Sequence, residues 1–123
     1  MKIFNFFFGR FKSLVPALQG ILFILKNEKN TWVHLLASGF AILLIYILKL
    51  NYIESLFFIS AIFLVWIAEF FNSAIEYTMD FIHPEKNSKI RIIKDISAAA
   101  VLLSAAYALI VAIIMIISKM NKF

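Results

Sequence analysis

Apolar side chains dominate this chain and group into one amphipathic segment and three long apolar segments. Within residues 4–28 they recur at intervals of three and four positions, with polar residues such as Lys12 and Gln19 between them. This period predicts an amphipathic helix that lies in a membrane interface. Ser13, shortly before Pro16, is a candidate N-cap for the regular part of that helix.

The three apolar segments cover residues 32–48, 53–80 and 96–117. Each is near or above the roughly 20 helical residues needed to cross a hydrocarbon core of ~30 Å. Residues 49–51 form a short break that predicts a tight turn, and residues 84–87 form a longer polar loop. The pattern predicts an all-α membrane protein, one domain over residues 1–123, with an interfacial helix and three transmembrane helices.

Composition supports the bilayer as the solvent. Hydrophobic residues make up 63% of the 123 positions, with a mean hydropathy of +0.94, whereas soluble domains are about 45–50% apolar. A chain this small cannot hide such an excess in a core of its own. Cysteine is absent, which excludes disulfides, a thiol nucleophile and Cys-based zinc sites.

Charge placement predicts the orientation and the partners. Five Lys and Arg residues precede the first span and four lie in the second loop, against one in the first loop and two in the tail. The positive-inside rule therefore places the N-terminus and the second loop in the cytoplasm. The basic residues flank apolar spans, so the net charge of +5 favours lipid headgroups and a phosphate-bearing ligand over nucleic acid. Arg10 and Lys12, with no small-residue cleavage site after them, argue against a cleaved signal peptide.

The second span carries an acidic face. Glu69, Asn72, Glu76 and Asp80 fall within an arc of about 80° when residues are placed at 100° intervals around a helix. A charge near the bilayer centre costs at least ~2.5–3.5 kcal/mol, so such acids need partners, a metal or a water-filled crevice. One interpretation is a polar network that only fixes helix packing. The other is a Mg²⁺–nucleotide site, because carboxylate and amide oxygens suit Mg²⁺.

Two further residues, Lys94 and Glu28, lie where they can serve this face. Lys94 stands at the cytoplasmic entrance of the third span, as a headgroup anchor or as a phosphate ligand. Glu28 marks the junction between the interfacial helix and the first span, as a surface charge or as a further metal or nucleotide ligand. His34 is interpreted as a structural or interfacial histidine. The small residues that follow Lys94 in the third span, Ser97 to Ala100 and Ser104 to Ala106, favour close helix contact.

These residues resemble a known family. The stretch from Glu69 to Asp80, EFFNSAIEYTMD, followed by KDISAAAVL from Lys94, closely resembles the signature of the prokaryotic diacylglycerol kinases, which include the undecaprenol kinases. The pattern E-x-x-N-[ST]-A-I-E with a downstream K-D is specific, and the resemblance covers essentially the whole chain. It implies MgATP-dependent phosphorylation of a membrane lipid alcohol, diacylglycerol or undecaprenol, at the bacterial inner membrane.

The resemblance also implies roles for individual residues. It assigns seven of them to the site: catalytic Glu69 and Asn72, the Mg²⁺ ligands Glu28 and Glu76, and the nucleotide-binding residues Lys94, Asp95 and Asp80. Glu69 is implied as the general base toward the lipid hydroxyl, and Lys94 as the residue that steadies the ATP phosphates. Family members are homotrimers with active sites between subunits, so a homotrimer is expected.

The chain departs from the family pattern at two loop positions. Asn87 stands where many relatives carry a His, and Ile93 where they carry a small residue, while Arg91 keeps a basic residue there. The run from Arg10 to Ser13 and the group from Glu28 to His34 are more similar to the branch with Gram-positive undecaprenol kinases. These residues do not by themselves separate the two lipids.

Two other functions fit the intramembrane acids. A small oligomer that conducts protons or cations uses such acids as an ion pathway, and it predicts ion flux without ATP consumption. A structural membrane subunit uses them to pair with a partner, and it predicts that Glu76→Gln alters assembly only. The family signature favours the kinase over both.

Overall fold

The computed structural model describes residues 2–83 and 87–121, with side chains from Leu14 onward. All regular secondary structure in these ranges is helical: α1 (Lys2–Asn27), α2 (Asn30–Ile47), α3 (Tyr52–Ile82) and α4 (Ser88–Met120). The predicted fold class is confirmed. Residues 84–86 of the predicted polar loop lie outside the described residues.

Helix α1 is continuous through Ser13 and Pro16, so the proposed N-cap at Ser13 is wrong. The apolar period before Ser13 continues the helix toward the N-terminus, and no polar residue interrupts it for long enough to end it. The chain forms two compact units, one up to Trp32 and one from Val33 onward. Within the first unit, the Thr31 hydroxyl donates to the carbonyl oxygen of Ile24 (3.3 Å). The backbone N–H of Thr31 donates to the carbonyl oxygen of Glu28 (3.3 Å). These bonds join the last turn of α1 to the residues that begin α2.

Helices α2, α3 and α4 are each long and apolar enough to cross a membrane. At 1.5 Å per residue, α2 is about 27 Å long, whereas α3 and α4 are about 46 and 50 Å long. The two longer helices therefore extend past a hydrocarbon core of ~30 Å. The predicted third span, 96–117, is the apolar part of α4, which begins earlier because Asn87 caps it by accepting the backbone N–H of Lys89 (2.9 Å).

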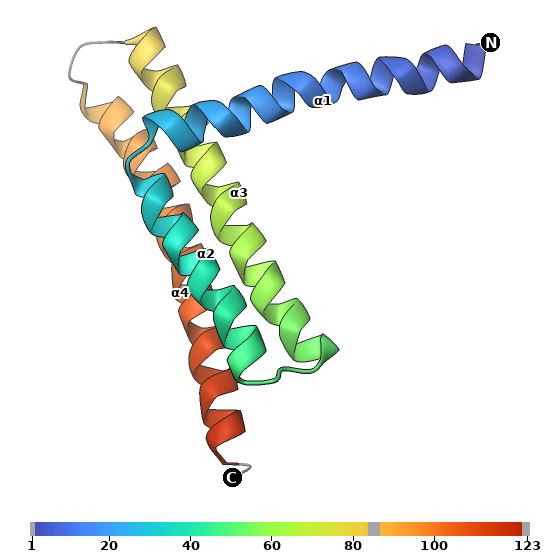
Figure 1. Ribbon diagram of the computed structural model, residues 1–123. Coiled ribbons are helices and arrows are strands. Elements are labelled where there is room, and N and C mark those ends of the chain that lie inside the picture. The colour runs from blue at the N-terminus through green and yellow to red at the C-terminus, as the bar shows by residue number, and fades with distance from the viewer. Residues whose placement is uncertain (1, 84–86, 122–123) are drawn as a thin grey trace. The chain divides into compact units, whose positions relative to one another are not determined.

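Helices α3 and α4 pack against each other along their lengths, in opposite directions (Figure 1). The buried residues of these two helices include four small ones, Ala61, Ser73, Ser97 and Ser104, beside Phe58, Glu69 and Val111. Small residues let two backbones approach closely in a membrane. Of the small residues expected to favour close helix contact, Ser97 and Ser104 are buried, whereas Ala98 to Ala100, Ala105 and Ala106 are exposed in the single chain.

The ends of α3 and α4 away from residues 84–86 are joined by an ion pair. Asn51 and Glu54 form a capping box at the start of α3, and Glu54 Oε2 also lies 2.7 Å from Lys119 Nζ. Both charged side chains are largely buried. The predicted tight turn before α3 is present, and it places Lys49 at a φ of 47°.

Most side chains of the spans are not covered by the chain itself. Only 6% of the most apolar stretch of α2, 22% of that of α3 and 11% of that of α4 is buried. In water this surface would be strongly unfavourable. Lipid, or other copies of the chain, must therefore cover it.

Candidate active site

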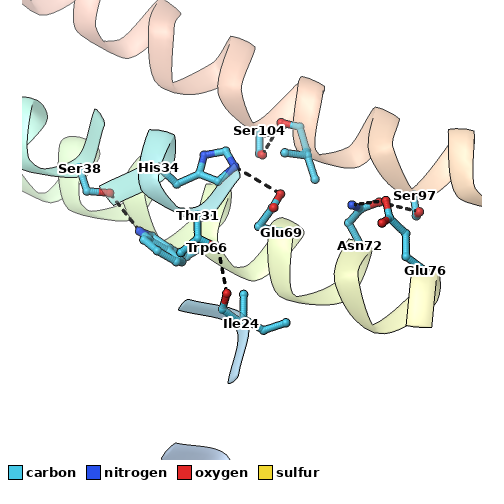
Figure 2. A network of polar contacts seen from close by, with 11 residues as sticks. Ile24, Thr31, His34, Ser38, Trp66, Glu69, Asn72, Glu76, Ser97 and Ser104 are labelled. Carbon is cyan, nitrogen blue, oxygen red and sulfur yellow. Dashed lines mark hydrogen bonds and ion pairs between the residues drawn. The ribbon is translucent and has the colours of Figure 1, made fainter. Parts of the chain in front are cut away.

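Polar side chains of α3 and α4 meet along the acidic face predicted for α3. The Asn72 amide donates to Glu76 Oε1 (3.0 Å), one turn further along the helix. Across the helix contact, the Ser97 hydroxyl lies 2.7 Å from Asn72 Oδ1 and 2.8 Å from the carbonyl oxygen of Lys94. Figure 2 shows the Asn72 amide between Glu76 and Ser97. Ser97 is buried, while Asn72 and Glu76 are half-buried. Ser97 thus fixes which end of the Asn72 amide faces Glu76.

Burial falls along α3 toward its C-terminal end. Glu69 is 3% exposed, Asn72 and Glu76 are half-buried, and Asp80 is exposed. The face therefore leads from a desolvated carboxylate to a solvated one. A carboxylate in an apolar surrounding and a carboxylate open to water suit different tasks, such as proton transfer and the binding of a charged ligand.

Lys94 of α4 lies beside the solvated end of this face. Its ammonium group forms an ion pair with Asp80, so the structure brings together two of the three residues that the sequence assigned to the nucleotide. Asp95, the third, is exposed and lies 3.7 Å from Arg91 on its own helix. Lys94 is about two-thirds buried, and it can supply a positive charge at this end of the face.

Glu69 lies in the contact between α2 and α3. Its Oε2 is 3.3 Å from His34 Nε2. The His34 ring meets the edge of Trp66 at a centroid distance of 6.2 Å, and the Trp66 indole N–H donates to the Ser38 hydroxyl (3.0 Å). Figure 2 shows this pair and the hydrogen bond between Trp66 and Ser38 at the same contact between α2 and α3.

Glu28 follows the last residue of α1 and precedes α2, as the sequence predicted, and it belongs to the first compact unit. Within the described residues, no three His, Cys, Asp or Glu side chains are close enough to share one metal ion. Glu76 nevertheless offers a suitable donor, because its carboxylate is half-buried and oriented by Asn72. Mg²⁺ is often held by one or two carboxylates together with water and substrate phosphates, and the Glu76 carboxylate fits that pattern.

Two residues of this site were not assigned to it from the sequence. Ser97 was expected only to pack, and His34 was interpreted as structural or interfacial. In the structure each contacts a residue of the acidic face. A sequence signal existed for Ser97, because it follows Lys94 by three positions on the same face of a helix. No comparable signal linked His34 to Glu69, since the two residues lie on different helices.

The fold and the site together define a multi-pass membrane protein whose polar face can carry group-transfer chemistry. The model of the family described as prokaryotic diacylglycerol kinase matches residues 16–116. This chain belongs to that family and is a lipid kinase. It is similar to the undecaprenol kinase of Bacillus subtilis (strain 168), with 28% identity over 110 residues, which are 89% of each chain.

Proposed function

We propose that this kinase transfers the γ-phosphate of ATP to the hydroxyl group of a membrane lipid alcohol, with Mg²⁺ bound to the nucleotide. Undecaprenol is the acceptor favoured by the name of the Bacillus subtilis relative, and diacylglycerol is the alternative favoured by the family description. The observation that carries the proposal is the gradient of burial along α3, from Glu69 to Asp80, with Lys94 beside its solvated end.

Each proposed role follows from the surroundings of the residue. Glu69, which is buried in the span, takes the proton of the lipid hydroxyl, so that the oxygen can attack the γ-phosphorus as the bond to the β-phosphate oxygen breaks and ADP leaves. Asn72 orients the Glu76 carboxylate. Lys94 holds the phosphates. When the nucleotide binds, the ion pair between Lys94 and Asp80 is replaced by contacts between Lys94 and the phosphates. Asp80 and Asp95 complete the nucleotide side of the site.

Glu76 and Glu28 would hold Mg²⁺, which would neutralise phosphate charge when bound. Phosphoryl transfer depends mainly on such positioning and neutralisation, with little covalent work by the protein. Glu28 belongs to a different compact unit from Glu76. The proposed assembly is a homotrimer with the site between subunits, in the bacterial inner membrane, with the N-terminus in the cytoplasm. The uncovered apolar surface of the spans supports an assembly in lipid.

The test is transfer of labelled γ-phosphate from MgATP in mixed micelles, with undecaprenol and diacylglycerol offered in parallel. We expect a labelled lipid product from the wild-type chain and a loss of about 10²- to 10⁴-fold in Glu69→Gln, because that range is typical of a removed general base. Glu54→Gln is the matched control, as it removes a carboxylate from the other end of α3. A folded Glu69→Gln with full activity would exclude this base. No product from either lipid, together with ion flux in liposomes, would favour a conducting oligomer.

A further inference from the structure

We infer that His34 is a positioning residue that holds the Glu69 carboxylate in the orientation needed for proton transfer. The role rests on the proposed function of Glu69 as the base. It begins with a distance of 3.3 Å between His34 Nε2 and Glu69 Oε2, which joins α2 to α3. Both side chains are withdrawn from solvent, with 15% of His34 and 4% of Glu69 exposed.

The burial of Glu69 makes this contact necessary. A carboxylate in an apolar medium is stable only when it is paired or hydrogen-bonded. Within residues 14–83 and 87–121, whose side chains are described, His34 is the one basic side chain in ion-pair contact with Glu69. His34 therefore supplies the polar partner that the buried carboxylate needs.

The imidazole of His34 is itself held in place. Trp66 lies one turn before Glu69 on α3 and places the edge of its indole against the His34 ring. Ser38 lies one turn after His34 on α2 and accepts the hydrogen bond of the Trp66 indole (3.0 Å). The two helices thus fix the ring from both sides of the contact. A ring fixed in this way can orient a carboxylate.

The contact also selects the oxygen that reacts. His34 engages Oε2 of Glu69, which leaves Oε1 as the oxygen that faces the lipid hydroxyl and accepts its proton. Loss of His34 then allows the carboxylate to rotate. This rotation lowers the rate of the chemical step, whereas the nucleotide contacts at Lys94 and Glu76 lie elsewhere on the face and keep their affinity.

The experiment compares three substitutions at one position. Gln carries an amide nitrogen at about the reach of Nε2, Asn is one methylene shorter, and Leu has no donor. We expect His34→Leu and His34→Asn to lower kcat by about 10- to 100-fold, as misplacement of a reacting group does, with KM for ATP unchanged. His34→Gln is expected to stay close to wild type. His83→Gln is the control, because His83 is the other histidine of the chain and is exposed at the end of α3.

A second readout does not depend on catalysis. Dicyclohexylcarbodiimide is an apolar reagent that modifies carboxyl groups inside membranes, and a carboxyl group that no neighbouring side chain holds is more open to it. We expect it to label Glu69 faster in His34→Leu and His34→Asn than in the wild type, His34→Gln and His83→Gln, as measured by mass spectrometry of the peptide that contains Glu69. If His34→Leu does not fold, the comparison of Gln with Asn decides the question.

The possible outcomes separate this inference from the proposed function. Equal kcat and equal labelling in folded Gln, Asn and Leu variants would overturn the role of His34. A fall in kcat/KM that comes entirely from KM would also overturn it. If the wild-type chain phosphorylates neither lipid while labelling of Glu69 still follows the residue at position 34, the pairing stands and the kinase assignment of Glu69 fails.

Discussion

The amide of Asn72 connects two helices, because it donates to Glu76 Oε1 at 3.0 Å while its oxygen lies 2.7 Å from the Ser97 hydroxyl. The amide can satisfy both contacts in only one orientation, since the nitrogen donates and the oxygen accepts. The position of the Glu76 carboxylate thus depends on a hydroxyl group from α4. This dependence makes Ser97 a sensitive point of the proposed site.

Ser97→Ala is expected to lower kcat by about 2- to 10-fold, which corresponds to the loss of one hydrogen bond worth about 0.5–1.5 kcal/mol. The measurement is the rate of lipid phosphorylation at saturating MgATP. Ser104→Ala is the matched control, because the buried Ser104 hydroxyl donates only to the carbonyl oxygen of Val101 on its own helix (2.8 Å). Equal losses in the two variants would show that Ser97 contributes packing alone.

Glu76→Gln is expected to reduce activity by about 10²- to 10³-fold, as does the removal of one group that stabilises charge developing in the transition state. The Mg²⁺ concentration needed for half-maximal rate should also rise, since the variant loses a carboxylate that would hold the metal. The measurement is a Mg²⁺ titration at fixed ATP. Glu76→Asp keeps the charge at a shorter reach and should lie between the wild type and Glu76→Gln. An unchanged Mg²⁺ requirement in Glu76→Gln would argue against metal binding at this position.

Lys94→Met is expected to raise KM for ATP by about tenfold or more, because the variant loses the positive charge proposed to hold the phosphates. A tenfold change corresponds to about 1.4 kcal/mol of binding free energy. Lys89→Met is the control, as Lys89 is exposed in the first turn of the same helix. The prediction fails if both lysine variants change KM equally.

Asp80→Asn should change thermal stability little. Asp80 is 65% exposed, and ion pairs open to solvent contribute about 0–1 kcal/mol. Thermal unfolding in detergent micelles measures this effect. A loss well above that range would mean that the pair with Lys94 holds α3 and α4 together.

The ion pair between Glu54 and Lys119 should contribute to stability and not to catalysis. Because 13% and 16% of these side chains are exposed, we expect Glu54→Gln and Lys119→Met each to cost about 1–3 kcal/mol, between the ranges for surface and buried pairs. Unfolding of both single variants and the double variant measures the coupling directly. The folded fraction of each should keep wild-type activity, because the pair lies at the opposite end of α3 from Glu76.

The sequence by itself determined the class of this protein. Three apolar segments near or above the length of a bilayer crossing predicted the spans, and all three lie within α2, α3 or α4 apart from Leu48 at the edge of the first. Helical spacing placed Glu69, Asn72, Glu76 and Asp80 on one face of α3, because residues three and four apart on a helix are neighbours. These inferences were within reach because each depends on one segment of chain and its period.

Only the tertiary structure decided which residues meet between helices. His34 faces Glu69, Ser97 faces Asn72, and Lys119 faces Glu54, and no sequence period predicts these pairs. A helix that is apolar on all sides has no stripe that fixes its rotation against a neighbour. The rotation is set instead by close packing of small residues such as Ala61 and Ser73. For that reason the acidic face could be predicted from the sequence, whereas its partners on α2 and α4 could not.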